Sequence, residues 1–435
     1  MSSDEEELDL HEVSSQLDNV TDDGIDTESE VLSLPPPPDQ PPPKRRLDLQ
    51  LQANATSCKS YDCVPHVAAV HPSPIYSLAT TRCFRWVFTG SEDGYIRKWD
   101  FFASINGKTS LTQVQRHHYV DSVTMAGVLI SWWENEEIPS EPVAENPETA
   151  KYPLGSDPPK LSPVYSMEVQ SEALWAVQGT ENGNINLLTV RHDEGKCHHV
   201  LRKHNLPVSV LRLTPSETGV ISGSWDKSIL EWDLNTGKIA RSYEGHSSQI
   251  TSAAFQPLQT PNPESTQDPS PAWDQKNPNI LLTTSIDGQC LIWDRREPAK
   301  DARRLGLPEK TPPWPVGAQM EPKFMQVVEM AQTVDEWDYA SQKHIQSFRM
   351  PSNSGPVSYV TSMPNGKHII CASNDNIRLW NTTTESTFTI RPGQESVIDP
   401  TCRYMITTSG NRGWEGASTN ACLFYDITPI VGQDQ

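Results

Sequence analysis

The chain lacks the sequence features of several large protein classes. Its eight cysteines include no Cys-x-x-Cys pair, a pattern that suits a reducing compartment better than a disulfide framework. No apolar run approaches the length that spans a membrane, and the acidic first seven residues do not fit a secretory signal. These absences predict a soluble, intracellular protein without membrane contacts.

The chain also has no excess of basic residues. Its formal net charge is −21 and its sequence pI is near 4.9. A general nucleic-acid-binding protein needs a basic surface, so we predict no direct contact with nucleic acid. The charge is unevenly distributed, because residues 1–43 contain 13 Asp or Glu and no Lys or Arg. The rest of the chain carries about −8, which is ordinary for a soluble domain.

Motifs for catalysis and cofactor binding are absent as well. There is no phosphate-binding Gly-rich loop, no Gly-x-Ser-x-Gly elbow and no carboxylate pair that stands out among the 56 acidic residues. Two pairs of adjacent histidines, 117–118 and 198–199, lie near Asp193 and Glu194. Neighbouring side chains on a strand point to opposite faces, and no further ligand completes a set. We therefore predict no enzyme activity, metal site, cofactor or small-molecule substrate.

Residues 1–60 are predicted to form a disordered tail. Acidic residues alternate with Ser, Thr and few apolar side chains, which leaves too little apolar surface to offset the entropy of ordering. Two proline runs, at 35–38 and 41–43, favour extended polyproline II. The basic residues 44–46 fit either a nuclear-import signal or, the interpretation we favour, a solvated linker.

The chain does contain a repeated strand pattern, which is clearest over residues 219–246. Val220–Ser222 and Ile229–Trp232 are short runs rich in β-branched and aromatic residues, separated by a polar turn. The second run ends in Trp-Asp at 232–233, and Gly-His follows at 245–246. These two dipeptides, recurring about every 40 residues, are the signature of a WD-repeat propeller blade.

Comparable units occur along most of the chain. Besides the third unit just described, they cover residues 75–100, 163–190, 246–294, 356–380 and 403–426, and a damaged fifth unit ends at 334–338. We therefore predict an all-β, seven-bladed WD-repeat β-propeller over residues 64–428. The polar segments 134–160 and 257–278 are predicted to be surface insertions.

The seventh and fifth units depart from the repeat, so we expect both blades to be incomplete. The seventh lacks a clear first strand, since only Glu395–Asp399 is available. In the fifth, residues 315–332 contain no strand–turn–strand pattern, and Phe324–Gln332 is predicted to be a short helix. However, codons can be chosen for Gln319–Gln332 so that another frame encodes DGTEIYAGRRNGT, a strand followed by an Asn-Gly turn. We therefore predict a frame error in the assigned coding sequence or a local frameshift in the gene.

Nine motif residues are predicted to hold the blades together. They form three sets: His71, Asp93 and Trp99; His204, Asp226 and Trp232; His246, Asp287 and Trp293. An Asp in a tight turn can accept from unpaired backbone groups, and a His linked to a strand hydroxyl and an indole N–H completes a buried network. Catalytic His–Asp pairs are the alternative, but a reactive pair would not recur from blade to blade.

Several segments are more specific than a generic blade. They cover residues 91–100, 126–129, 133–136, 222–227, 292–296, 372–379, 399–403 and 408–414. The last, TSGNRGW, is the most distinctive because generic blades lack it. In these segments the chain resembles, over residues 64–427, the WD-repeat subunit family of the SAGA transcriptional coactivator. The acidic tail also fits that family, although it is shorter here.

The resemblance implies a non-catalytic scaffold subunit of a nuclear, histone-acetylating coactivator that acts on chromatin. Such a subunit would engage TATA-binding protein, contact other subunits of the complex and regulate transcription by RNA polymerase II. We expect the acidic segments to contact the basic, DNA-binding surface of that partner, while a solubilising tail without a partner is the alternative. The candidate contact residues are Asp4, Glu5, Glu6, Glu7, Glu134, Glu136, Glu137, Arg412 and Trp414.

Two other classes of propeller stay open at this point. A substrate receptor of a ubiquitin ligase normally carries an adaptor-binding helical motif before its blades, and residues 1–60 show none. A propeller hydrolase would need a polar catalytic cluster at the mouth of its channel, which the sequence alone does not test.

Overall fold

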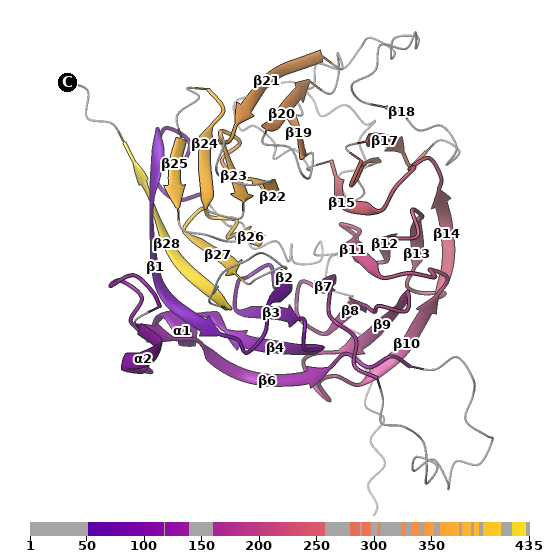
Figure 1. Cartoon of the computed structure of the whole chain (residues 1–435), viewed down its shortest axis with the longest axis horizontal. Helices are drawn as coiled ribbons and strands as arrows, with labels where there is room; N and C mark the ends of the chain where they lie inside the picture. Colours follow the sequence, from indigo (N-terminus) through magenta and orange to yellow (C-terminus); the bar gives the residue numbers. More distant parts are fainter. Residues whose placement is uncertain are drawn as a thin grey trace, which may run out of the picture. The chain divides into compact units, whose positions relative to one another are not determined.

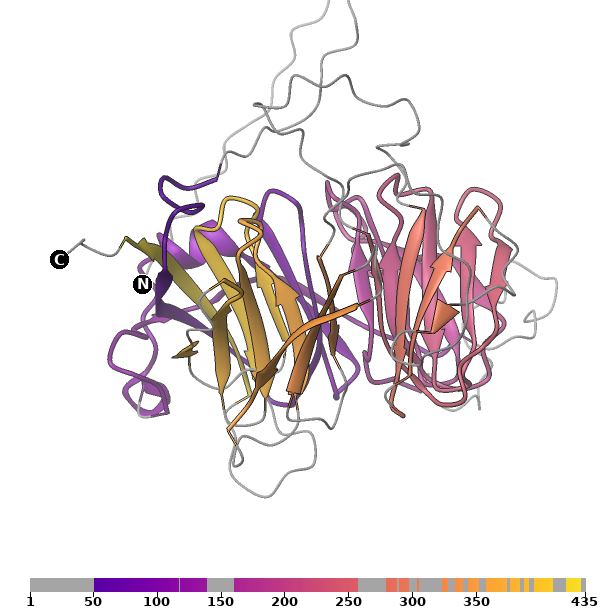
Figure 2. The same cartoon turned by 90° about the horizontal axis from the view of Figure 1, so that it is seen from above.

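The computed structural model describes residues 51–116, 118–138, 160–256, 279–287, 289–296, 303–304, 323–327, 333–338, 343–351, 357–373, 376–383, 387–390, 395–409 and 420–431. The chain divides into two units, residues 1–48 and 49–435, and every described residue belongs to the second. In this unit seven β-sheets surround a central axis (Figure 1), and in the perpendicular view their strands run between the two faces of the ring (Figure 2).

The first four sheets each have four strands, ordered from the centre outward. Sheet 1 contains β2 (Ile75–Thr80), β3 (Trp86–Ser91), β4 (Tyr95–Asp100) and β6 (Val128–Glu134). Sheet 2 contains β7 (Met167–Val169), β8 (Trp175–Gly179), β9 (Asn184–Thr189) and β10 (Cys197–Arg202). Sheet 3 contains β11 (Val208–Leu213), β12 (Gly219–Ser224), β13 (Ile229–Asp233) and β14 (Lys238–Tyr243). Sheet 4 contains β15 (Ile250–Phe255), β16 (Ile280–Ser285), β17 (Cys290–Asp294) and β18 (Arg303–Arg304).

The other three sheets differ more in size. Sheet 5 contains β19 (Lys323–Val327), β20 (Thr333–Asp338) and β21 (Lys343–Arg349). Sheet 6 contains β22 (Val357–Ser362), β23 (His368–Ser373), β24 (Ile377–Asn381) and β25 (Thr387–Ile390). Sheet 7 contains β26 (Glu395–Ile398), β27 (Tyr404–Ser409), β28 (Ala421–Ile430), β1 (Ser60–Val70) and β5 (Met125–Ala126). Two short helices, α1 (Phe101–Ile105) and α2 (Gln113–Arg116), lie between β4 and β5.

The architecture confirms the predicted all-β propeller. Six sheets have the four or five strands of a complete blade, and sheet 5 has three strands in the part of the chain that the structure describes. The apolar core lies between neighbouring sheets, where, for example, Ile221 and Tyr243 of sheet 3 pack with Trp293 of sheet 4. Comparable clusters of described residues join every other pair of neighbouring sheets except sheets 4 and 5.

Serine hydroxyls join the inner strands of consecutive sheets. Ser77 Oγ donates to the carbonyl oxygen of Val164 at 2.9 Å, Ser166 Oγ to that of Val208 at 2.7 Å, and Ser209 Oγ to that of Ile250 at 2.7 Å. These bonds satisfy buried backbone carbonyl groups across each boundary between sheets 1 and 4.

The expectation of an incomplete seventh blade is wrong. Glu395–Ile398 forms β26, which pairs with β27, so the first strand is present but short. The outer strand comes from the other end of the propeller, because β1 pairs antiparallel with β28 from Ser60 opposite Ile430 to Val70 opposite Ala421. Sheet 7 consequently joins the two ends of the β-structure and holds the ring together.

The predicted tail of 1–60 extends too far into the ordered domain. Ala55, Cys58 and Tyr61 are buried in the apolar cluster that contains Met363 and Ile370. Asn365 Nδ2 donates to Ala55 O at 3.0 Å and to Tyr61 Oη at 2.9 Å. Residues 51–60 therefore pack against sheet 6, because they supply the apolar side chains that the acidic part of the tail lacks. Residues 1–50 lie outside the described part.

The predicted helix over Phe324–Gln332 is also wrong in the part of this segment that the structure describes. Residues Lys323–Val327 form β19, which pairs antiparallel with β20. The neighbouring strand supplies backbone hydrogen-bond partners, and this tertiary pairing overrides the local helical preference of the Met-rich sequence. Residues 328–332, the insertion 257–278 and positions 139–159 of the insertion 134–160 lie outside the described residues.

Candidate functional site

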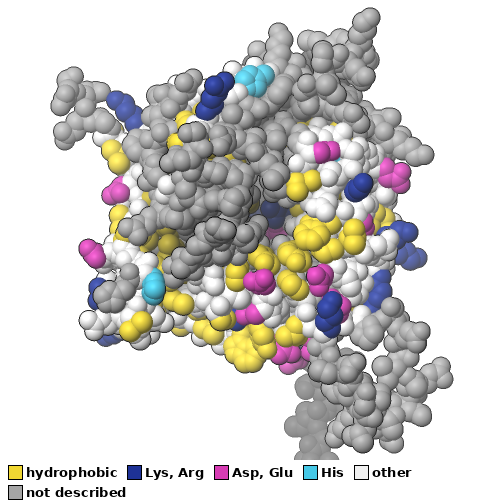
Figure 3. Space-filling view, viewed as in Figure 1, with side chains coloured by type: hydrophobic (Ala, Val, Ile, Leu, Met, Phe, Trp, Pro, Cys, Tyr) yellow, Lys and Arg dark blue, Asp and Glu magenta, His cyan; other side chains and the backbone are white. Residues whose placement is uncertain are grey.

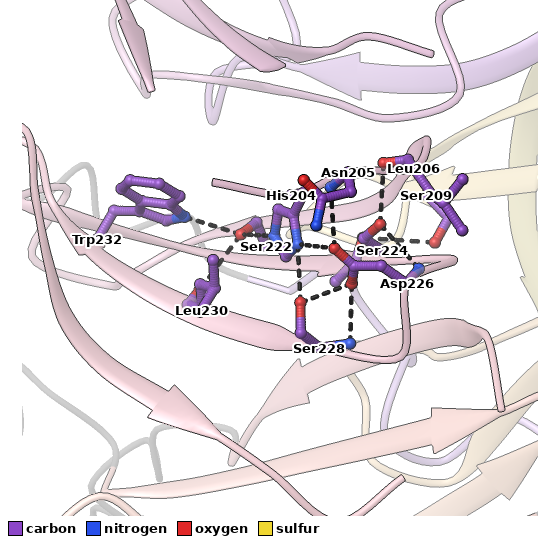
Figure 4. A network of polar contacts seen from close by, with 11 residues as sticks. His204, Asn205, Leu206, Ser209, Ser222, Ser224, Asp226, Ser228, Leu230 and Trp232 are labelled. Atoms are coloured by element: carbon purple, nitrogen blue, oxygen red, sulfur yellow. Dashed lines mark hydrogen bonds and ion pairs between the residues drawn. The ribbon is translucent and has the colours of Figure 1, made fainter. Parts of the chain in front are cut away.

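The motif residues of sheet 3 form one buried polar network (Figure 4). His204 precedes β11, Ser222 lies in the middle of β12, and Trp232 lies near the end of β13. Ser222 Oγ accepts from Trp232 Nε1 at 2.8 Å and lies 2.8 Å from His204 Nε2. On the other side of the imidazole ring, His204 Nδ1 is 3.0 Å from Asp226 Oδ2. The predicted set of three residues is thus brought together around a serine.

Asp226 closes the turn between β12 and β13 as well as orienting His204. Its carboxylate accepts from the backbone N–H of Ser228 at 2.9 Å and from that of Asn205 at 3.2 Å. Burial raises the pKa of Asp226, but the hydrogen bonds with His204 and Ser228 outweigh it and hold this pKa well below its usual value. The carboxylate is therefore ionised at neutral pH, and its oxygens accept hydrogen bonds from these neighbours.

Sheet 4 builds a similar arrangement, in which a hydroxyl lies between the histidine and the aspartate. Thr283 Oγ1 accepts from Trp293 Nε1 at 2.8 Å and lies 2.8 Å from His246 Nε2. His246 Nδ1 is 2.9 Å from Ser285 Oγ, which donates to Asp287 Oδ1 at 2.5 Å. Hydrogen bonds from Ser247 and Ser285 lower the pKa of Asp287 to about 2.

Sheet 1 keeps the histidine, hydroxyl and indole but uses its aspartate differently. His71 Nε2 is 2.8 Å from Thr89 Oγ1, which accepts from Trp99 Nε1 at 2.9 Å. His71 Nδ1 is 2.9 Å from the carbonyl oxygen of Ala69, and Asp93 forms an ion pair of 2.7 Å with Arg97. Burial lowers the pKa of His71 to about 4, so this ring is neutral at pH 7.

Sequence reasoning anticipated a strand hydroxyl in each network without identifying it. The hydroxyls belong to Thr89, Ser222 and Thr283, and each lies four residues before the aspartate of its set. That spacing is a usable signal in the sequence. In sheet 6 Cys371 occupies the corresponding position, and the indole Nε1 of Trp380 has no hydrogen-bond partner within the described residues.

These networks have the properties of structural contacts. His71, His204 and their indole partners Trp99 and Trp232 are at most 5% exposed, and the same connections recur in three sheets. In the described residues no group of three or more His, Cys, Asp or Glu side chains is placed to hold a metal ion. All eight cysteines are free thiols. None of the helices in the described part combines the length and hydrophobicity needed to cross a membrane.

Three of the residues predicted to contact a partner, Glu134, Glu136 and Glu137, lie at the end of β6 and just after it. Glu134 Oε1 accepts from Tyr95 Oη at 3.0 Å, and Glu137 forms an ion pair of 3.1 Å with Lys160. The carbonyl oxygen of Glu136 accepts from Asn186 Nδ2 at 3.0 Å. Lys160 also pairs with Glu181 at 3.3 Å, which connects this acidic segment to the turn between β8 and β9. The other candidates, Asp4, Glu5, Glu6, Glu7, Arg412 and Trp414, lie outside the described residues.

Comparison with known proteins assigns this propeller to a family. The family model of the SPT8 β-propeller matches residues 61–270 and 265–428. The chain belongs to the SPT8 β-propeller family. It is 35% identical to the SAGA complex subunit Spt8 of Schizosaccharomyces pombe, over 87% of this chain and 81% of that protein. It is 34% identical to the SAGA complex subunit SPT8 of Saccharomyces cerevisiae, over 85% of this chain and 73% of that protein.

The SPT8 match covers every sheet of the structure. It begins within β1 and runs to β28, so it includes the strand pair that closes sheet 7. It also spans sheet 5, where the repeat pattern is damaged. Membership of the SPT8 family confirms the resemblance inferred from several sequence segments, of which TSGNRGW is the most distinctive.

Proposed function

We propose that this chain is a non-catalytic scaffold subunit of a nuclear SAGA-type histone acetyltransferase complex. In this role it contacts other subunits and TATA-binding protein, and thereby regulates transcription by RNA polymerase II. The observation that carries the proposal is the similarity, over most of the chain, to two proteins named as SAGA complex subunits. We also propose that the damaged sheet 5 lies between sheets 4 and 6 and completes a propeller of seven blades.

The structural role of the motif residues supports a scaffold. The His–Asp pairs that would be the obvious candidates for acid–base chemistry are occupied by buried hydroxyls, indoles and backbone groups. A catalytic histidine needs access to a substrate, whereas His71 and His204 are each 5% exposed. A rigid ring of sheets with two faces and a circumference provides separate surfaces for several partners.

Charge supports TATA-binding protein as one of these partners. Residues 1–43 carry 13 acidic side chains and no Lys or Arg, and Glu134 and Glu137 add acidic groups on the propeller. A DNA-binding surface is basic, so such segments attract it and suppress binding to acidic partners. This electrostatic attraction raises the rate of association with TATA-binding protein and makes the affinity depend on salt concentration.

Affinity purification of the tagged full-length chain from nuclear extract tests the assignment. We expect a histone acetyltransferase, further coactivator subunits and TATA-binding protein to co-purify in amounts comparable to the bait. Recovery of ubiquitin-ligase adaptors in their place would favour the substrate-receptor class and reject the proposal. An identically tagged WD-repeat propeller from another complex is the control for non-specific capture.

The role of the tail is tested with purified proteins. Removing residues 1–48 leaves the unit that contains every described strand intact. We expect this variant to bind TATA-binding protein more weakly and with a smaller dependence on salt. A full-length variant with the 13 acidic residues of positions 1–43 changed to Asn or Gln separates charge from length. Unchanged affinity and unchanged salt dependence in both variants would remove the tail from the mechanism.

A further inference from the structure

Three aromatic side chains from consecutive sheets form a row on one face of the ring. The rings of Tyr76 and Tyr165 are stacked, with centroids 5.3 Å apart and planes inclined by 11°. Trp225 continues the row, with its centroid 5.3 Å from that of Tyr165 and its plane inclined by 45°. All three side chains are half-buried. They come from β2, from the residues before β7 and from the turn after β12, so only the propeller brings them together.

A repeated backbone hydrogen bond fixes which turn residues share this face. In sheets 1, 3 and 4 the residue before the network aspartate donates its N–H to the segment before the first strand. The bonds join Glu92 to Pro74 at 2.9 Å, Trp225 to Pro207 at 3.1 Å and Ile286 to Gln249 at 3.0 Å. Equivalent positions of a propeller lie on the same face, and in sheet 2 this position is occupied by Glu181.

The chemical character of these turn residues changes from sheet to sheet. In sheets 3 and 4 the turn residues Trp225 and Ile286 are apolar, and Leu206 is held near Trp225 because Ser224 Oγ donates to its carbonyl oxygen at 2.9 Å. Leu206 is 48% exposed and Ile286 is 40% exposed. We call Tyr76, Tyr165, Trp225, Leu206 and Ile286 the inner arc. Exposed apolar side chains that gather on one face mark an interaction site more often than scattered ones do.

The other end of the inner arc is acidic. Glu92 is exposed, and the side chain of Glu181 is 43% exposed. Burial raises the pKa of Tyr165, and the charges of Glu181 and Glu92 raise it further. Both carboxylates therefore lie close enough to influence this tyrosine of the row. Lys160, which pairs with Glu181, is itself 65% exposed, and a pair in that position is weak enough for a ligand to replace. In the space-filling view of one face of the ring, acidic side chains lie beside hydrophobic ones toward the centre (Figure 3).

We propose that the inner arc binds an extended segment of a partner protein that combines a basic and a large apolar residue. Its Lys or Arg side chain lies at the Tyr76–Tyr165 end, between the carboxylates of Glu92 and Glu181. Its apolar side chain packs against Trp225, Leu206 and Ile286. Complementary charge at one end and apolar contact at the other fix the position of the segment, as in other peptide grooves. This inference stands on the surface itself and does not depend on the coactivator assignment.

Selection from a random 12-residue peptide library displayed on phage tests the proposal with the purified full-length chain. We expect enrichment of peptides in which Lys or Arg accompanies Leu, Ile, Phe or Trp. The best peptide, labelled with fluorescein, then gives dissociation constants by anisotropy. Replacing its basic residues by citrulline or norleucine is expected to weaken binding about tenfold, a typical effect for a charge-assisted contact.

Variants of the chain locate the binding site. Ile286→Ser and the double variant Glu92→Gln, Glu181→Gln change exposed side chains, and each is expected to weaken binding at least fivefold. Trp132→Ala and Glu172→Gln are the matched controls, because Trp132 is 59% exposed on the outer strand β6 and Glu172 is exposed in the β7–β8 turn. We expect both controls to bind like the wild type.

Three results would overturn the proposal: no enrichment of peptides, enrichment of acidic peptides, or equal binding to the arc variants and the wild type. A chain that selects basic–apolar peptides but purifies without coactivator subunits would keep this inference and lose the proposed function. The reverse outcome would keep the proposed function and lose the inference.

Discussion

Ser222 Oγ accepts a hydrogen bond from the indole Nε1 of Trp232 at a distance of 2.8 Å. The same oxygen is 2.8 Å from His204 Nε2, so one hydroxyl satisfies two buried polar groups of sheet 3. Ser222 is 0% exposed, so its hydroxyl is shielded from solvent. A single side chain thus determines whether the network is complete.

The first prediction concerns this hydroxyl. Ser222→Ala leaves His204 Nε2 and Trp232 Nε1 buried without their shared partner, which should lower the free energy of unfolding by about 1–3 kcal/mol. Urea denaturation followed by tryptophan fluorescence measures the change. Ser222→Thr should lose less, because Thr89 and Thr283 perform this role in sheets 1 and 4. Ser110→Ala, at an exposed position, should be neutral, and an equal effect of Ser110→Ala and Ser222→Ala would contradict the account.

The second prediction is a dependence of stability on pH that arises from His71. Its pKa is lowered to about 4 by burial, whereas the unfolded chain has a histidine pKa of about 6.5. As pH falls from about 6.5 to 4, the unfolded state therefore takes up the proton first, and stability declines by up to about 1.4 kcal/mol per pH unit.

His71→Gln removes this group from the comparison. Unfolding free energies at pH 7.5, 6.5, 5.5 and 4.5 should fall less steeply for the variant than for the wild type. His198→Gln is the matched control, because His198 is exposed on β10, and it should follow the wild-type curve. Parallel curves for the wild type and His71→Gln would show that the ring of His71 is not kept neutral by the fold.

The third prediction concerns the close contact between sheets 2 and 3. A Cβ atom on Gly179 would lie 2.6 Å from Ser166 Oγ and 2.8 Å from the carbonyl oxygen of Val208. Gly179→Ala therefore forces β8 away from Ser166 and from β11, and it should cost about 1–3 kcal/mol, as overpacking does elsewhere. Gly245→Ala is the control, since the atoms nearest to its Cβ would be side-chain carbons of Leu291 and Trp293 at 3.2 Å.

Hydrogen exchange should locate the effect of Gly179→Ala. Amides of β7, β8 and β11 are expected to exchange faster, while those of sheet 6 on the opposite side of the ring stay protected. Equal thermal midpoints for Gly179→Ala and Gly245→Ala would mean that the contact between the sheets tolerates a methyl group.

The fourth prediction is genetic. We expect the codons for Gln319–Gln332 to encode DGTEIYAGRRNGT in another frame, because that peptide supplies the strand and turn that the fifth unit lacks. Sequencing the gene and its transcript across this region provides the test. A nucleotide sequence without that alternative frame ends the idea. If the frame exists, a chain carrying the shifted segment should unfold at a higher temperature than the chain with the printed sequence.

Regular blades could be predicted from sequence almost to the residue. The unit predicted over residues 75–100 begins with β2 at Ile75, contains β3 and ends with β4 at Asp100. The β-branched and aromatic runs, together with the Asp-Gly turn between them, act over short distances in the chain, so local patterns are sufficient. The three His, Asp and Trp sets were found for the same reason.

Features that depend on distant partners could not be predicted. β1 has neither the Trp-Asp nor the Gly-His signature, and its partner β28 lies at the other end of the propeller sequence. The role of Asp93 was also missed in detail, because the ion pair with Arg97 four residues away replaces contact with His71. The contact between Tyr76 and Tyr165 exists only because consecutive sheets pack side by side.

The pairing of β1 with β28 has a consequence for synthesis on the ribosome. Val70 and its partner Ala421 are separated by most of the polypeptide, which takes about 20–70 s to translate at typical rates. During that time β1 has no partner strand, while the intervening sheets are synthesised and fold. A nascent chain is therefore most exposed to aggregation, and most in need of a chaperone, until the codons for β28 have been read.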